Sequence, residues 1–367
     1  MFIRQNNLSK HNFFMSLALM QAQKNIGRTK TNPSVGCVIV KNEKLISVAS
    51  TGVNGTPHAE SNAISSSNEN VKGSDLYVTL EPCAHYGKTP PCTSKIIKSG
   101  IKRVFFSMID PDIRSYKKSL KIFKNKNIIV KKNINLFKIK NFYKSYTNFK
   151  TNKLPYVAAK LAVSKDSYTV NKTSRWITNK SSRGRVHLMR STHDVILTTS
   201  KTVIADNPSY NCRIEGLDKC SPSKVIIDKD LKIPINSKII KLGKKNKTYI
   251  FYNKSNKKKI SQLKKLKIKL VKLNIDVNLN FDLKDVLSKI KSLGYSRIFI
   301  ESGINLLNNF LNENLVDDLY IFKSSEKIKK FGSNNFKNSI KRFTYGKKIK
   351  IFNVNLHGDK MYLYNLK

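Results

Sequence analysis

The sequence predicts two α/β domains arranged one after the other. Helical and strand-like hydrophobic patterns alternate along the chain, and a polar, basic stretch at residues 142–153 interrupts them. The length of 367 residues exceeds that of most single domains, which have about 100–200 residues. We therefore expect domains at residues 1–148 and 149–367, with the basic stretch as the linker. Hydrophobic residues make up 40% of the chain, which excludes a fully disordered or fibrous protein.

The first domain begins with a helix at residues 10–24, because apolar side chains recur there at helical spacing. The side chains expected near one face are those of Phe13, Phe14, Leu17, Met20 and Gln21. The continuous apolar run at 35–40 predicts a strand buried on both faces, and a turn at 41–44 leads into a second strand at 45–49. The remaining expected elements are a helix from Pro57, a strand at 76–80, a helix after Pro91 and a strand at 103–108.

The second domain contains further short apolar segments typical of strands. They lie at residues 156–162, 194–198, 224–227, 248–252 and 268–273. Residues 282–293 give the clearest helix, since leucine, valine and isoleucine fall on one face and Gly294 supplies the stop. A strand at 297–301 then leads through Ser302 and Gly303 into another helix.

The chain is strongly basic. It carries 70 Lys and Arg residues against 23 Asp and Glu, a formal net charge of +47, which is typical of nucleic-acid or anionic-membrane binders. The lysines are nevertheless spread over the whole chain and accompany an excess of Asn and Ile, as expected from a bias towards AT-rich codons. We favour this compositional explanation and leave a nucleic-acid partner open.

Cysteine content and hydropathy bear on the cellular location. Five cysteines are too few, and odd in number, for a secreted disulfide scaffold, so reduced thiols or metal ligands are expected. The sequence shows no secretory signal and no run of about 18 apolar residues. These observations predict a soluble, cytoplasmic protein without a membrane partner.

Three short motifs predict a zinc site. His58-Ala59-Glu60 is followed by Glu81-Pro82-Cys83 and then by Pro91-Cys92. One imidazole and two thiolates, from His58, Cys83 and Cys92, suit catalytic zinc, which keeps a fourth position open for water and lowers the pKa of that water to about 7. Glu60 is then expected to be the catalytic proton carrier. Each motif is common by chance, but together and beside expected helix starts they match the signature of zinc-dependent base deaminases.

The spacing of the cysteines indicates which class of zinc-dependent deaminase the sequence resembles. Deaminases acting on nucleic acid have Pro-Cys-x-x-Cys, whereas eight residues, 84–91, separate Cys83 from Cys92. The strings at 31–40, 57–60 and 78–92 resemble the deaminase half of the bifunctional riboflavin-biosynthesis deaminase/reductases. This resemblance implies a cytidine-deaminase-like, three-layer αβα domain that hydrolytically deaminates 2,5-diamino-6-(5-phosphoribosylamino)pyrimidin-4(3H)-one. It also implies substrate contacts from Asn32, His85 and Lys88.

Two positions depart from this family's pattern. Thr51 stands where a histidine is usual before Pro-His-Ala-Glu, and Asp112 stands where Asp-Pro-Asn-Pro has its asparagine. Both would affect substrate binding rather than the metal.

The second half lacks a Gly-x-Gly-x-x-Gly fingerprint, so a standard dinucleotide-binding domain is not expected. Instead, residues 155–166, 174–178, 202–208 and 300–303 resemble the reductase half of the same family. The resemblance implies a dihydrofolate-reductase-like α/β fold that uses NADPH to reduce 5-amino-6-(5-phosphoribosylamino)uracil to the ribitylamino product. The implied cofactor contacts are Val163, Trp176, Thr202, Asp206, Gly303, Ile304 and Asn305. The implied substrate contacts are Ser174, Arg190, Tyr210, Arg213 and Glu301.

Three reductase positions depart from the family. Ser167 replaces a glycine, Lys229 replaces a small polar residue, and Ile304 replaces a proline. A turn at 167 that needs a positive φ would be strained without glycine, and a lower affinity for NADPH would follow.

Two alternatives stay open. One is a deaminase acting on tRNA or another nucleic acid, and the other is a non-catalytic, basic RNA-binding protein on a decayed enzyme scaffold. The leading hypothesis has a small phosphorylated pyrimidine as substrate, Zn²⁺ and NADPH as cofactors, no specific nucleic acid, and association into a homo-oligomer. No role is assigned to Cys37, Cys212, Cys220, His11, His187, His193 and His357.

Overall fold

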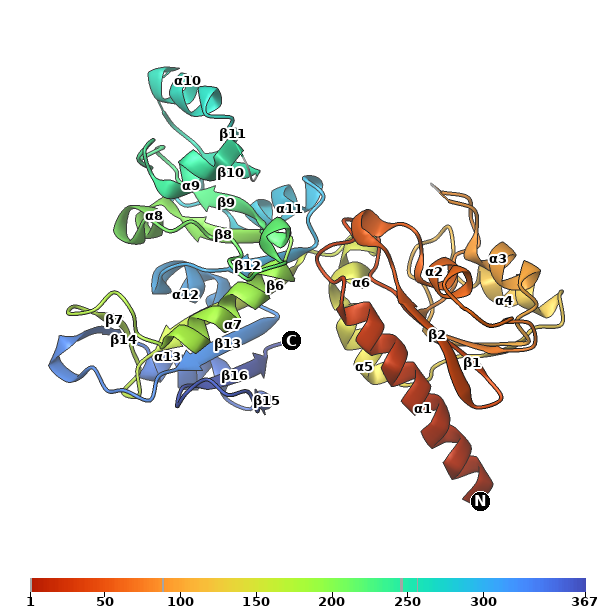
Figure 1. The fold of residues 1–367 in the computed structure, drawn as a ribbon. Coiled ribbons are helices and arrows are strands. Elements are labelled where there is room, and N and C mark those ends of the chain that lie inside the picture. Colours follow the sequence, from red (N-terminus) through yellow and green to blue (C-terminus); the bar gives the residue numbers. More distant parts are fainter. Residues whose placement is uncertain (1, 88, 245–246, 256) are drawn as a thin grey trace. The chain divides into compact units, whose positions relative to one another are not determined.

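The computed structural model describes residues 2–87, 89–244, 247–255 and 257–367, with side chains from residue 9 onward except that of residue 244. It divides the chain into two compact units, Met1–Lys153 and Leu154–Lys367 (Figure 1). Each unit has its own sheet and its own hydrophobic core. The unit boundary therefore falls after Lys153 rather than after residue 148.

The first unit has a five-stranded sheet in the order β2-β1-β3-β4-β5. Its strands are β1 (Gly36–Lys41), β2 (Lys44–Ser50), β3 (Asp75–Leu80), β4 (Arg103–Met108) and β5 (Ile129–Lys131). β1 pairs antiparallel with both β2 and β3, whereas β3, β4 and β5 run parallel. The predicted hairpin and the predicted strands at 35–40, 76–80 and 103–108 are confirmed.

Helices cover both faces of this sheet, which confirms the three-layer αβα domain (Figure 1). One face carries α1 (Phe2–Gln23) and α5 (Leu136–Phe142). The other carries α2 (Ala59–Ser65), with α3 (Cys92–Lys98) and α4 (Lys118–Lys124) beside it. The two short helices α2 and α3 follow the prolines at 57 and 91, as expected.

The buried face of α1 differs from the prediction. Phe13 and Met20 are mostly exposed, while Phe14, Met15, Ala18 and Ala22 lie in the core. The reason is a close approach of two backbones: a Cβ atom at Gly36 would lie 1.8 Å from the carbonyl oxygen of Ala18 and 2.6 Å from the nitrogen of Ala22. Only small side chains permit this distance, so the alanines face β1, while Phe13 and Met20 lie on the exposed side of the helix.

The prediction that residues 142–153 form a linker is also wrong. Residues 144–150 form a helix, α6 (Lys144–Lys150), on which Ser145 and Tyr146 are buried. Tyr146 donates to Asp110 at 2.9 Å, and the Lys150 ammonium lies 2.7 Å from the carboxylate of Asp112. The polar composition that indicated a linker therefore serves to hold α6 on the loop after β4.

The Asp112–Lys150 pair supports a test of α6. Hydrogen bonds from Arg114, followed by those from Lys150, hold the pKa of the Asp112 carboxyl well below its usual range. Because the folded-state pKa is depressed, this stabilisation is present above the ordinary aspartate pKa and is lost as the pH falls below it. We expect Lys150→Met to lower the free energy of unfolding at pH 7 by about 1–2 kcal/mol. Denaturant unfolding checks this, with the exposed Lys140→Met as control; equal effects of the two variants would contradict it.

The second unit has a nine-stranded sheet in the order β11-β10-β9-β8-β12-β6-β13-β16-β15. All neighbours from β11 to β13 are parallel, and β16 and β15 add an antiparallel edge. The strands are β6 (Tyr156–Val163), β8 (Val195–Thr199), β9 (Ser223–Ile227), β10 (Thr248–Tyr252), β11 (Lys269–Lys272), β12 (Arg297–Ile300), β13 (Asp318–Lys323), β15 (Ile349–Ile351) and β16 (Lys360–Asn365). A separate pair joins β7 (Tyr168–Asn171) to β14 (Gly332–Asn335).

Two cores lie on the two faces of this sheet. One contains apolar side chains of α11 (Leu283–Ser292) and α12 (Ile304–Asn312), with α13 (Lys337–Thr344) packed against it. The other contains side chains of α7 (Lys180–Ser191), α8 (Ser200–Asp206), α9 (Lys238–Lys241) and α10 (Lys257–Lys265). The predicted helix at 282–293 is confirmed, with Asp282 as its N-cap and Gly294 at a φ of 91°.

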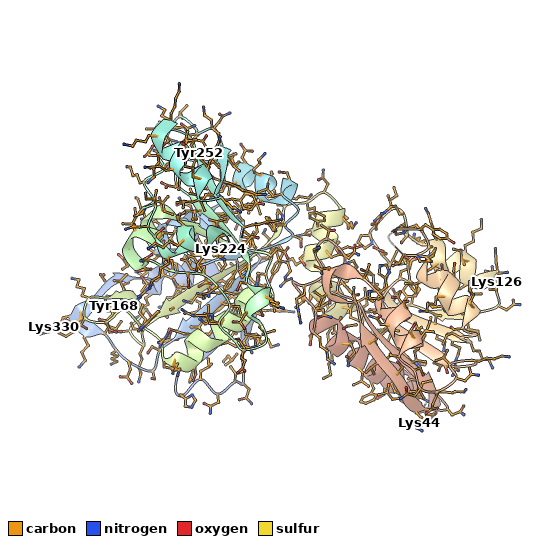
Figure 2. The ribbon with its side chains drawn as sticks, turned by 45° about the horizontal axis from the view of Figure 1, so that its top comes forward. Lys44, Lys126, Tyr168, Lys224, Tyr252 and Lys330 are labelled. Atoms are coloured by element: carbon orange, nitrogen blue, oxygen red, sulfur yellow. The ribbon has the colours of Figure 1, made fainter. Side chains whose placement is uncertain are left out.

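Exposed lysines occur in both units. Lys44, Lys126 and Lys330 are exposed in separate parts of the chain, whereas Lys224 on β9 is buried (Figure 2). All five cysteines are free thiols. Within the described ranges, none of the helices combines the length and apolar character that crossing a membrane requires.

Candidate active sites

Three side chains of the first unit converge as metal ligands. His58 is the N-cap of α2, Cys83 follows β3, and Cys92 opens α3. The Nδ1 atom of His58 lies 3.4 Å from the Cys83 sulfur and 3.3 Å from the Cys92 sulfur, and all three ligand atoms lie within 4.8 Å of one another. One imidazole and two thiols at this spacing fit tetrahedral zinc with one open position.

The environment of Cys83 favours the thiolate form that binds metal, whereas the hydrogen bond to Cys83 and then burial raise the pKa of the Cys92 thiol well above its usual range. Cys83 accepts hydrogen bonds from the thiol and, at 3.2 Å, from the backbone N–H of Cys92. Together with the bond from His58, these contacts lower the pKa of Cys83 to about 4. A thiolate at Cys83 is thus available at neutral pH without competition from a proton.

Glu60 lies beside the ligands without being one of the three. It occupies the first turn of α2, only 4% of it is exposed, and its carboxyl group lies within hydrogen-bonding reach of Cys92. Burial, and then the charge of Cys83, raise the pKa of Glu60 to about 7. The sequence prediction that this carboxylate lies near the metal ligands is in agreement with this geometry.

Glu81 is a site residue to which sequence reasoning assigned no role. Its carboxylate is 2% exposed and accepts four hydrogen bonds, from the backbone N–H groups of Asp110, Lys117 and Ser119 and from the Ser119 hydroxyl. These bonds tie the 110–119 loop to the segment that carries Cys83. The sequence signal that could have identified Glu81 was the position of a glutamate between a buried strand and the Pro-Cys motif.

The predicted substrate contacts of this unit that can be described, Asn32 and His85, lie on loops, and His85 follows the ligand Cys83 by two residues. Asn32 donates to the carbonyl of Gly55 at 3.0 Å, and the Nδ1 atom of His85 lies 2.9 Å from the hydroxyl of the buried Ser115. Lys88 lies outside the described residues. Both side chains that can be described are therefore held in place by the protein rather than free in solvent.

The two departures from the family pattern have structural partners. Thr51 is buried, and its hydroxyl accepts a hydrogen bond from the backbone of Val35. Asp112 forms ion pairs with Arg114 and Lys150. A negative charge in place of the usual amide is thus balanced within the first unit.

The predicted cofactor residues of the second unit gather at the carboxyl ends of neighbouring parallel strands. Thr202 lies in the first turn of α8 after β8, and Gly303 is the N-cap of α12 after β12. The Thr202 hydroxyl accepts from the Gly303 N–H at 3.2 Å and lies 3.1 Å from the Ser302 hydroxyl. Ile304 and Asn305 start α12, and Val163 ends the adjacent β6 with a buried side chain. A helix start at this edge of a parallel sheet fits a nucleotide phosphate.

Trp176 and Asp206 lie near each other through Arg175. The Arg175 guanidinium donates to the Asp206 backbone oxygen at 2.5 Å and stacks 5.0 Å from the Trp176 ring centroid. Arg183 stacks on the same indole at 4.5 Å. Ser174 is exposed and bonds within its own loop to the backbone of Trp176. This indole, half exposed between two guanidinium groups, offers a stacking surface for an aromatic ring.

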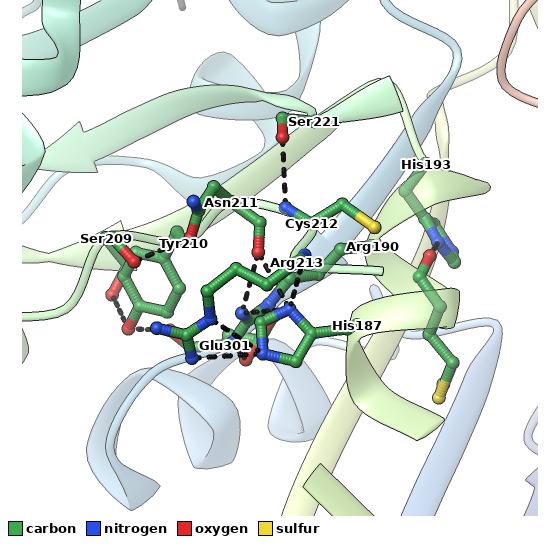
Figure 3. A network of polar contacts seen from close by, with 12 residues as sticks. His187, Arg190, His193, Ser209, Tyr210, Asn211, Cys212, Arg213, Ser221 and Glu301 are labelled. Carbon is green, nitrogen blue, oxygen red and sulfur yellow. Dashed lines mark hydrogen bonds and ion pairs between the residues drawn. The ribbon is translucent and has the colours of Figure 1, made fainter. Parts of the chain in front are cut away.

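Four of the five predicted substrate contacts of the second unit, Arg190, Tyr210, Arg213 and Glu301, form a second, more buried cluster, and Ser174 is not among them (Figure 3). Arg190 on α7 makes a bidentate ion pair with Glu301 at 2.6 and 2.8 Å. Although burial raises the pKa of Glu301, Arg190 more than offsets this, and the pKa lies below its usual range. Tyr210 donates to the backbone oxygen of Glu301, and its ring lies 5.6 Å from the Arg190 guanidinium. Arg213 follows on the same loop.

Sequence reasoning missed two residues of this cluster. His187, to which no role was assigned, is buried between Arg190 and Arg213. Lys160 lies in β6, where burial lowers its pKa and the charges of Glu301 and Arg190 act on it. The position of a lysine within an otherwise apolar strand was the sequence signal that could have identified Lys160.

Ser167 occupies the positive-φ turn at which strain was expected without glycine, and the lower affinity for NADPH stays a prediction. It takes a φ of 71°, a left-handed conformation that glycine adopts at lower cost. Lys229 donates to the backbone oxygen of Leu279 at 3.1 Å and so has a partner within the second unit.

Comparison with known proteins identifies the family. Two models match in tandem: the cytidine and deoxycytidylate deaminase zinc-binding region over residues 8–108, and the RibD C-terminal domain over 155–325. The riboflavin biosynthesis protein RibD of Aquifex aeolicus is 34% identical over 311 residues, which are 84% of this chain and 85% of that one. The chain belongs to the RibD family. RibD of Bacillus amyloliquefaciens is 35% identical over 313 residues, covering 84% of this chain and 83% of the other.

Solved RibD structures share the whole architecture. Acinetobacter baumannii RibD covers 98% of this chain and 99% of its own, with a TM-score of 0.84 and 28% identity. A Thermotoga maritima diaminohydroxyphosphoribosylaminopyrimidine deaminase/5-amino-6-(5-phosphoribosylamino)uracil reductase covers 98% and 100%, with a TM-score of 0.81 and 27% identity. The tandem of a deaminase-like and a reductase-like unit is thus the RibD arrangement, and zinc and NADPH are the cofactors that it implies.

Proposed function

We propose that this chain catalyses two consecutive steps of riboflavin biosynthesis, one in each unit. In the first unit, 2,5-diamino-6-(5-phosphoribosylamino)pyrimidin-4(3H)-one loses its 2-amino group as ammonia by hydrolysis. In the second unit, the resulting 5-amino-6-(5-phosphoribosylamino)uracil is reduced by NADPH to the ribitylamino product. The observation that carries the proposal is the convergence of His58, Cys83 and Cys92 beside Glu60, in a chain whose second half is the RibD C-terminal domain.

The residues of the first unit divide into metal ligands, proton carrier and substrate contacts. His58, Cys83 and Cys92 would hold the zinc ion, which when bound supplies Lewis acidity that activates water. Glu60 takes a proton from the attacking water at its carboxylate and gives it to the leaving amine, a role that its buried place beside the ligands supports. Asn32 and His85, both fixed by hydrogen bonds, contact the pyrimidine nucleotide, and the sequence resemblance adds Lys88 as a further substrate contact.

In the second unit, the cofactor and the substrate would occupy neighbouring clusters. Thr202, Gly303, Ile304 and Asn305 hold the NADPH phosphates at the start of α12, and Val163, Trp176 and Asp206 contact the rest of the cofactor. Arg190, Tyr210, Arg213, Glu301 and Ser174 bind the phosphorylated substrate. The planar forks of the two arginines suit phosphate and ribose oxygens.

One assay separates the two steps. The diaminopyrimidine nucleotide is incubated with the zinc-loaded chain, with and without NADPH, and the products are identified by mass. We expect ammonia and the ribosylaminouracil without NADPH, and the ribitylamino compound with it. Asp206→Asn should leave ammonia release intact and abolish NADPH oxidation. Absence of ammonia would overturn the first half, and a ribosyl product in the presence of NADPH would overturn the second.

The long loop between the two cysteine ligands and the appended reductase unit speak against a nucleic-acid base deaminase. Homo-oligomer formation and a cytoplasmic location stay predictions. Light scattering of the purified chain and fractionation of cells test them.

A further inference from the structure

His187 lies between two guanidinium groups of the second unit. It precedes Arg190 by one turn on α7, so both side chains project from the same face of the helix. Arg213 comes from the loop after α8 and places its guanidinium against the other edge of the imidazole (Figure 3). Only 9% of His187 is exposed, so its two ring nitrogens must find partners inside the protein.

The partners select one tautomer of the ring. Nδ1 lies 3.0 Å from the backbone oxygen of Asn211, which only accepts, so Nδ1 must carry the proton. Nε2 lies 3.0 Å from Nη2 and 3.3 Å from Nε of Arg213, which only donate, so Nε2 must be the acceptor. The opposite tautomer would let Nδ1 accept from the Arg213 backbone N–H at 3.2 Å and from Nη1 of Arg190 at 3.4 Å, but it would point the Nε2 proton at the guanidinium of Arg213.

The charges around the ring keep it neutral. Burial, then the positive charges of Arg190 and Arg213, lower the pKa of His187 to about 4, while Asn211 and Glu301 act in the opposite direction. The imidazole is therefore uncharged near pH 7, and its Nε2 lone pair is available to the guanidinium.

The two arginines differ in how their charge is used. Glu301 forms a bidentate ion pair with Arg190 and compensates its charge. Among residues that the structure describes, Arg213 has no carboxylate partner, and its guanidinium contacts are those to His187. A neutral acceptor fixes the orientation of Arg213 and leaves its positive charge uncompensated, which a carboxylate in the same place would not do.

We propose that His187 is a positioning residue of the reductase site: its neutral, Nδ1-protonated ring orients Arg213 so that the guanidinium charge meets the phosphate of the substrate. This inference rests on the proposed function, in which Arg213 contacts the phosphorylated substrate. His187 itself does not touch the substrate in this role.

Two isosteric variants separate the two nitrogens of the ring. The amide of His187→Asn reaches the position of Nδ1 and provides no acceptor for Arg213, whereas the oxygen of His187→Gln reaches the position of Nε2. We expect His187→Asn to raise the KM for 5-amino-6-(5-phosphoribosylamino)uracil about tenfold or more, with kcat within about threefold. His187→Gln should restore most of the affinity. His193→Asn is the matched control, since His193 is buried at the end of α7, bonds to the Met189 carbonyl and stacks on Phe299.

A double-mutant cycle shows whether the effect passes through Arg213. Arg213→Ala alone should raise KM about tenfold or more, and adding His187→Asn to it should raise KM no further. The inhibition constant of inorganic phosphate against the same substrate should follow the same pattern. Thermal unfolding of each variant shows whether the unit is folded. If His187→Asn is unfolded, the KM of His187→Gln is compared with that of Arg213→Ala instead.

The outcomes distinguish the inference from the function on which it rests. An unchanged KM in Arg213→Ala would overturn the role of Arg213 in the proposed function. A raised KM in Arg213→Ala together with a wild-type KM in His187→Asn would overturn the inference alone. Independent, multiplicative effects of the two substitutions would also overturn it, because His187 would then act by another route.

Discussion

Glu60→Gln should lower the rate of ammonia release by about 10²- to 10⁴-fold while the chain keeps its zinc. Glutamine has the same shape as glutamate, but its amide neither takes up nor releases a proton in the reaction. Because the side chain is only 4% exposed and is not one of the three clustered ligands, the substitution removes proton transfer and leaves the metal site in place. Ammonia release, zinc per chain and thermal unfolding are measured on the same preparation.

Two comparisons make this result specific. Glu69→Gln, which changes an exposed glutamate paired with Lys44 in the same unit, should leave ammonia release unchanged. Reduction of 5-amino-6-(5-phosphoribosylamino)uracil by Glu60→Gln should proceed at the wild-type rate, since that step belongs to the second unit. If the variant released ammonia at more than about a tenth of the wild-type rate, Glu60 would not be the proton carrier.

Cys83→Ala should lose its zinc and with it the deamination of the diaminopyrimidine nucleotide. Removing one of three clustered ligands leaves a single imidazole and a single thiol, and we expect zinc affinity to fall about 100-fold or more. The backbone N–H of Cys92 also loses its acceptor at Cys83, so the start of α3 is weakened. Zinc content after dialysis against a weak chelator, together with ammonia release, measures the effect.

The matched control is Cys220→Ala, another half-buried free cysteine, located in the second unit. It should keep full zinc content and ammonia release. Retention of stoichiometric zinc by Cys83→Ala would show that the metal is bound elsewhere, and zinc loss without loss of ammonia release would show that deamination does not need the metal.

Elements of the fold that depend on local patterns could be read from the sequence. The apolar runs at 35–40 and 76–80 are fully buried strands, and the repeat of apolar side chains on α11 together with Asp282 and Gly294 specified that helix from end to end. The face of α1 could not be read this way. Its orientation depends on the close approach to Gly36, and hydrophobicity alone favours Phe13 and Met20, which the structure leaves exposed.

The functional sites, like the fold, were predictable only where they depend on local sequence patterns. The spacing of His58, Glu60, Cys83 and Cys92 indicated the zinc cluster because these residues and the short helices that carry them are readable locally. Glu81, Lys160 and His187 were not assigned, because their roles depend on partners that are distant in the sequence. His187 lies 26 positions from Arg213, and only the packing of α7 beside the loop after α8 brings them together.

By itself the sequence therefore indicated the class of the protein, its two chemistries and its candidate metal ligands. The ligands were predicted from residue types at short spacings, which chemistry constrains directly, whereas the two chemistries were implied by the resemblance of longer motifs to the deaminase/reductase family. The tertiary structure alone decided which face of α1 is buried, that residues 144–150 are a helix and not a linker, and which arginine keeps an uncompensated charge. Those features depend on contacts between segments far apart in the chain, where packing and burial rather than local pattern set the free energy.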